Sequence, residues 1–91
     1  MTVDGRYLLK AAIGHGGMGT VWRATDTVLR RDVAVKEVAP PPGVSPADRE
    51  AMYQRMMREA RAAAMISHPS VVQVYDVVTD GGRPWIVMEL L

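Results

Sequence analysis

Three features of this 91-residue sequence could together hold the phosphates of a nucleotide. The first is the glycine-rich stretch GHGGMGTV at residues 14–21, the second is Lys36 at the end of VAVK, and the third is Glu59. Glycines let backbone N–H groups approach phosphate oxygens, a lysine supplies positive charge, and a carboxylate can pair with that lysine. The chemistry indicated is the binding of a phosphorylated ligand.

The residues around the glycines decide which kind of phosphate loop this is. In a dinucleotide-binding fold the glycines open a helix, but Thr20-Val21-Trp22 favours a strand. A Walker-type loop needs Gly-Lys-Ser/Thr, and Gly19 is followed directly by Thr20. We interpret the stretch as a hairpin that folds over a triphosphate, with a ligand-free hairpin tip as the alternative. His15 is expected to be exposed and not catalytic, and Met18 either shields the phosphates or is a tip residue.

Lys36 is predicted to share one face of a strand with Ala34, because side chains alternate along a strand. A flat ring could lie on Ala34 while Lys36 reaches its phosphates. Ile13 and Val21, which flank the glycines, could add apolar cover for the same ring. An ordinary surface lysine on a half-exposed strand is the alternative.

Glu59 is the one acid in a stripe of apolar residues at helical spacing. The stripe consists of Met52, Met56, Glu59, Ala63 and Ile66. A buried carboxylate is costly unless it is paired, and Lys36 on the facing sheet is the predicted partner. The alternative is a weak pair with Arg55, four residues earlier on the helix.

Five strands and one helix are predicted to position these residues. Strands are expected over 7–13, 20–25, 32–38, 71–78 and 84–90, and the helix should run from the N-cap Ser45 and Pro46 to about residue 66. Asp80-Gly81-Gly82 is a turn signal between the last two strands. This order predicts an α+β domain, a five-stranded antiparallel sheet with the main helix on one face.

Composition excludes several other classes of protein. The chain is 48% hydrophobic and 23% charged with a net charge of +1, which argues against a nucleic-acid or anionic-membrane surface. It has no cysteine, no apolar run of membrane-spanning length and no signal-peptide pattern. We therefore expect a cytoplasmic protein with no membrane segment and no nucleic-acid partner.

Taken together, the motifs resemble the N-terminal lobe of a protein kinase of the bacterial eukaryotic-like serine/threonine type. The resemblance covers residues 7–91 and includes GHGGMGTV, VAVK, REA at 58–60, HP at 68–69 and IVME at 86–89. It implies that ATP is the cofactor, that Lys36 holds the α- and β-phosphates and pairs with Glu59 in the active state, and that Met88 is the gatekeeper. The nucleotide-binding set that the resemblance implies is Ile13, Gly14, His15, Gly16, Gly17, Met18, Gly19, Val21, Ala34, Lys36, Met88, Glu89 and Leu91, the last two through hinge backbone groups.

The sequence also lacks motifs that such a kinase needs. His-Arg-Asp, Asp-Phe-Gly and Ala-Pro-Glu do not occur, so the catalytic aspartate and the side chains that hold Mg²⁺ are missing. We expect residues 1–91 to be an N-lobe fragment that ends in the hinge, binds ATP weakly, does not catalyse alone and can self-associate. Protein substrates and Mg²⁺ would belong to the complete kinase. The alternative is a free-standing nucleotide binder or a pseudokinase-like interaction module.

Overall fold

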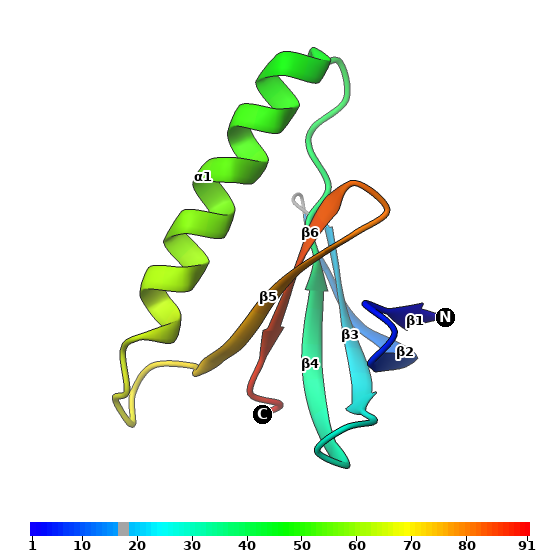
Figure 1. Ribbon diagram of the computed structural model, residues 1–91, viewed down its shortest axis with the longest axis vertical. Coiled ribbons are helices and arrows are strands. Elements are labelled where there is room, and N and C mark those ends of the chain that lie inside the picture. Colours follow the sequence, from blue (N-terminus) through cyan, green and yellow to red (C-terminus); the bar gives the residue numbers. More distant parts are fainter. Residues whose placement is uncertain (17–18) are drawn as a thin grey trace.

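One curled sheet and one helix make up the computed structural model, which describes residues 1–16 and 19–91. The elements are β1 (Thr2–Val3), β2 (Tyr7–Gly16), β3 (Gly19–Asp26), β4 (Arg31–Glu37), α1 (Pro46–Ala64), β5 (Val74–Asp80) and β6 (Arg83–Met88). The strand order is β1-β2-β3-β4-β6-β5, and each neighbouring pair is antiparallel. Helix α1 packs against β5 and β6 at one end of the sheet (Figure 1). The predicted α+β class and antiparallel sheet are confirmed.

The number of strands differs from the prediction, because the described residues form six strands rather than five. The additional strand, β1, has two residues and pairs with Tyr7 and Leu8 of β2. Asp4 and Gly5 turn the chain between them, and both have positive φ angles. A two-residue strand is too short to show the alternation by which longer strands are predicted. The other boundaries differ from the prediction by up to three residues at each end.

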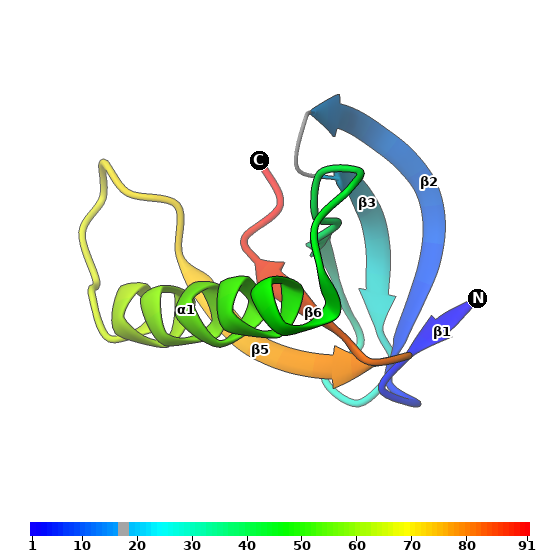
Figure 2. The ribbon, with the colours of Figure 1, turned by 90° about the horizontal axis from the view of Figure 1, so that it is seen from above.

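The packed core lies on the face of β4 that carries Val33 and Val35, both completely buried. The sheet curls so that its distant strands also contribute to this core (Figure 2). The core cluster consists of Val3, Tyr7, Ala24, Val33, Val35, Val78, Trp85 and Val87. Ala34 and Lys36 alternate with these valines, so they belong to the opposite face of β4. The fold therefore separates its stabilising face from the face that carries the lysine.

A network of hydrogen bonds closes the end of the sheet where β1, β2 and β3 meet. Buried Asp26 accepts hydrogen bonds from Arg6 Nε at 2.9 Å and Arg6 Nη2 at 2.8 Å, and from the backbone N–H groups of Val28 and Leu29. The bond to Arg6 is the main reason why the pKa of Asp26 lies far below its usual range. The carboxylate thus stabilises both the Arg6 side chain and the turn that follows β3.

Helix α1 begins as predicted and faces the sheet differently from the prediction. The Ser45 hydroxyl accepts the N–H of Asp48 at 3.2 Å, and Pro46 is the first helical residue. The buried residues of the helix are Tyr53 and Ala60, seven positions apart, rather than the predicted stripe around Glu59. Methionine and alanine lie on several sides of this helix, so the apolar pattern alone did not fix its rotation.

Candidate functional site

Strand pairing gathers five of the relevant side chains on one face of the sheet. Lys36 lies opposite Val21 of β3 and opposite Ile86 of β6, and Ala34 lies opposite Met88. Residues that are directly opposite in an antiparallel pair have side chains on the same face. Since Ala34 and Lys36 are two positions apart, all five side chains share that face. The arrangement places a lysine at the edge of an apolar surface.

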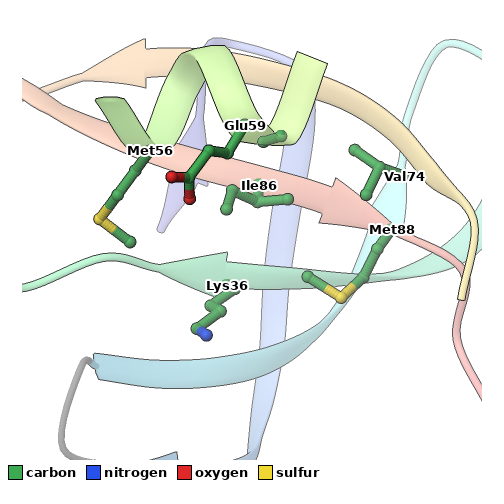
Figure 3. A pocket seen from close by; sticks show the side chains of 7 residues that line it. Lys36, Met56, Glu59, Val74, Ile86 and Met88 are labelled. Atoms are coloured by element: carbon green, nitrogen blue, oxygen red, sulfur yellow. The ribbon is translucent and has the colours of Figure 1, made fainter. Parts of the chain in front are cut away.

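A cavity of about 300 Å³ lies where this face meets helix α1. Figure 3 shows the side chains that line it, drawn from the helix and from β4, β5 and β6. The lining residues are Lys36, Met56, Glu59, Ala60, Val74, Ile86 and Met88. The structure therefore brings Lys36, Glu59 and Met88 to one cavity, although they are far apart in sequence. Apart from Lys36 and Glu59, the lining is apolar.

The predicted buried ion pair between Lys36 and Glu59 is wrong for this structure. Glu59 instead lies 3.9 Å from Arg55 on the same helix, and its side chain is 71% exposed. Within residues 1–16 and 19–91, Lys36 takes part in no ion pair, and its side chain extends away from the Glu59 carboxylate (Figure 3). Glu59 lies at the rim of the buried helix face, where water can solvate its charge, so burial does not force it to pair.

The glycine stretch forms the predicted hairpin between β2 and β3. Gly14 lies opposite Val21, His15 opposite Thr20, and Gly16 opposite Gly19. The His15 Nδ1 and Thr20 Oγ1 atoms are 3.4 Å apart across the hairpin, and His15 is exposed as expected. Ile13 precedes the hairpin and is 52% exposed. The predicted site residues Gly17 and Met18 lie outside the described residues.

The three described glycines of this hairpin have different structural roles. Gly19 has a φ of +133°, and a Cβ atom there would lie 1.9 Å from the backbone oxygen of Glu37. No other residue type fits that position without a shift of β3 away from β4. A Cβ on Gly16 would meet nothing within 4 Å, and one on Gly14 would make only an ordinary contact with Val21. The hairpin thus has open space beside Gly14 and Gly16 and a tightly packed base at Gly19.

The segment after β6 is tied to the start of β5. The Glu89 N–H donates to the Gln73 carbonyl oxygen at 2.8 Å, and the Gln73 N–H donates to Glu89 Oε1 at 3.3 Å. Leu91, which was also predicted to offer hinge backbone groups, is 92% exposed. Sequence reasoning missed Gln73, although it stands alone as a polar residue among Val71, Val72, Val74 and Tyr75. A polar residue within an apolar run is a signal for a specific hydrogen-bonding role.

Two properties of the described residues, 1–16 and 19–91, bear on the setting of the site. In these residues no three His, Asp or Glu side chains lie close enough together to hold a metal ion. The helix found in these two ranges does not combine the length and hydrophobicity that crossing a bilayer requires. The charged side chains that line the cavity are those of Lys36 and Glu59.

Comparison with known proteins matches this chain to protein kinases. The family model described as protein kinase domain matches residues 7–91. A probable serine/threonine-protein kinase pknA2 of Bifidobacterium longum is 41% identical over 87 residues, covering 96% of this chain and 11% of that protein. Serine/threonine-protein kinase PknL of Mycobacterium bovis is 40% identical over 89 residues, covering 98% of this chain and 21% of its own length.

Solved structures share the fold as well. The kinase domain of Mycobacterium tuberculosis PknI superimposes with a TM-score of 0.80 at 26% identity, covering 100% of this chain and 34% of that one. The apo form of PpkA-294 gives a TM-score of 0.78 at 26% identity, covering 93% of this chain and 35% of that one. The chain thus spans 11% to 21% of the two curated relatives and about a third of these kinase structures.

Proposed function

This chain belongs to the protein kinase domain family, and from that premise we propose that it forms the ATP-binding lobe of a serine/threonine protein kinase. The observation that carries the proposal is the position of Lys36. It shares a face with Ala34, lines the cavity that Glu59 and Met88 also line, and lies in the strand that pairs with the glycine hairpin. The named relatives are serine/threonine kinases, which supports that specificity for this chain.

The triphosphate of ATP fits the space beside the hairpin. The positions of Gly14 and Gly16 are open where side chains would otherwise project, so backbone N–H groups can approach phosphate oxygens. The Lys36 ammonium lies on the neighbouring strand and can neutralise part of the phosphate charge. We assign the α- and β-phosphates to Lys36, and the cover over them to the hairpin.

The adenine ring fits the apolar part of the same face. Val21 and Ala34 provide a flat surface, and Met88 stands opposite Ala34 on β6. Since the N–H of Glu89 is already bonded to Gln73, the Glu89 carbonyl is the group that can accept a hydrogen bond from the base. These contacts distinguish a purine ring from a bare polyphosphate.

Phosphoryl transfer itself requires groups that this chain does not supply. The transfer depends on positioning and on stabilising charge, and an aspartate must accept the proton of the substrate hydroxyl. The chain has no His-Arg-Asp or Asp-Phe-Gly motif, and residues 1–16 and 19–91 contain no cluster of metal ligands. Its share of the work is to hold and orient the nucleotide, so it is not expected to catalyse alone.

The proposal is tested by Lys36→Met in the complete kinase that contains this chain. Methionine keeps the length of the side chain and removes its charge, so we expect phosphoryl transfer to fall by about a hundredfold or more while the thermal unfolding temperature stays unchanged. Lys10→Met is the matched control, because Lys10 is the other lysine and is exposed on β2. Full activity in Lys36→Met would defeat the proposal.

A further inference from the structure

Gln73 connects three parts of the fold, namely the end of α1, the start of β5 and the segment after β6. Its side-chain Nε2 donates to the carbonyl oxygen of Ala64 at 3.2 Å and to that of Val74 at 3.0 Å. Its backbone N–H and C=O both bond to Glu89. Ala64 is the last residue of α1, the helix that carries Glu59. A single residue is thus bonded both to the end of the helix and to the segment after β6.

Each of these bonds satisfies a group that the secondary structure leaves open. The last four carbonyl groups of a helix have no partner within the helix, and Gln73 supplies a donor to one of them. Val74 and Met88 are the last paired residues at this end of β5 and β6, and Glu89 lies one residue beyond β6. The Gln73–Glu89 bonds extend that ladder by one position. The path of the chain immediately after Met88 therefore depends on where Gln73 is held.

Gln73 borders open space on one side, where its side chain is held by hydrogen bonds. Gln73 and Glu89 line a cavity of about 350 Å³ together with Ser67, His68, Pro69 and Val71. A side chain beside such a space lacks the contacts with which a dense core would fix its rotamer. Its position then depends on the acceptors at Ala64 and Val74. Removal of the amide would leave the backbone at Gln73 free to shift, and Glu89 would shift with it.

We propose that Gln73 is a positioning residue for nucleotide recognition, which acts by fixing Glu89 relative to helix α1. The inference rests on the proposed function, since it assumes that the base binds beside Glu89. In this arrangement the base contact depends on Gln73, whereas the phosphate contacts at Lys36 and the hairpin do not. Substitution of Gln73 therefore lowers the affinity for the base and leaves the affinity for the phosphates unchanged.

The test is a titration of the 91-residue chain, labelled with ¹⁵N, with ATP and separately with inorganic tripolyphosphate. We expect Gln73→Met to weaken ATP binding about three- to tenfold, the range of one net hydrogen bond. Tripolyphosphate binding should stay within about twofold of the unsubstituted chain. Gln54→Met is the matched control, because Gln54 Nε2 donates only to Glu50 on the exposed side of the helix, at 2.9 Å. It should change neither affinity.

The outcomes separate this inference from the proposed function. Equal ATP affinities for Gln73→Met and the unsubstituted chain would overturn the role of Gln73, and so would an equal loss for ATP and tripolyphosphate. If the unsubstituted chain binds neither ligand, the proposed function fails and the inference fails with it. If Gln73→Met does not give a folded amide spectrum, Gln73→Asn replaces it. Its shorter amide cannot reach Ala64 but remains polar, and the same loss confined to ATP is expected.

Discussion

Alanine substitutions at Gly19 and Gly16 should separate the structural role of the glycine hairpin from its binding role. At Gly19 a Cβ atom would lie 1.9 Å from the Glu37 oxygen and 3.0 Å from the Glu37 carbonyl carbon, and φ is +133°. Strain at such a backbone angle costs about 1 to 3 kcal/mol. Relief of the collision, by moving β3 away from β4, costs about 1 to 3 kcal/mol more. Gly19→Ala should therefore destabilise the fold by about 2 to 6 kcal/mol.

A loss of this size is a large part of the stability of such a small chain. Domains are stable by about 0.05 to 0.15 kcal/mol per residue, which gives about 5 to 14 kcal/mol here. Urea unfolding, followed by the fluorescence of Trp22 and Trp85, should show a midpoint lower by about 0.7 M or more for Gly19→Ala. Gly16→Ala should unfold within about 0.5 kcal/mol of the unsubstituted chain, yet bind ATP more weakly, because its methyl group projects into the space assigned to phosphate. Equal midpoints for the two variants would refute the packing argument at Gly19.

Two further predictions concern the pH dependence of stability. The pKa of Asp26 is lowered mainly by its hydrogen bond to Arg6, so its contribution is present above about pH 4 and is lost as the pH falls below that value. Asp26→Asn should lower the free energy of unfolding by about 2 kcal/mol at neutral pH, and urea unfolding should then show a smaller decrease in stability below about pH 4. Asp32→Asn, at an exposed site, should leave that acid-induced decrease unchanged. Burial is the main factor that raises the pKa of Tyr7 to about 12. Its contribution is therefore present below about pH 10 and is lost between about pH 10 and pH 12, and a Tyr7→Phe variant that still lost stability in that interval would contradict the assignment.

Most of the secondary structure could be predicted because its signals are local. The turn at Gly81 and Gly82 illustrates this, since both residues have positive φ angles, as a two-residue hairpin turn requires. Ser45 and Pro46 likewise mark the start of the helix by their own chemistry. Strand alternation also separated Lys36 from the valines that form the core. Each of these features depends on a few adjacent residues.

The features that sequence reasoning missed depend on tertiary contacts. The rotation of α1 is set by which residues fit against β5 and β6, and the helix has apolar residues on more than one side. The prediction placed Glu59 in the buried stripe, and the structure places it at the rim beside Arg55. Strand β1 forms because Val3 completes the core beside Tyr7. A segment of two residues is too short for its sequence pattern to predict such a contact. The role of Gln73 depends on bonds to Ala64 and Glu89, nine and sixteen positions away.

The most direct test of nucleotide binding uses the two lysines of this chain, Lys10 and Lys36. An ATP derivative that carries an acyl group on its terminal phosphate transfers that group to a lysine amine held beside the phosphates, and ATP is released. Lys36 lines the cavity, whereas Lys10 is exposed on β2 and does not line it. Mass spectrometry of the peptides should therefore find the label on Lys36, and an excess of ATP should suppress it. Equal labelling of both lysines, or labelling of Lys36 that ATP does not reduce, would contradict the assignment of this face to the nucleotide.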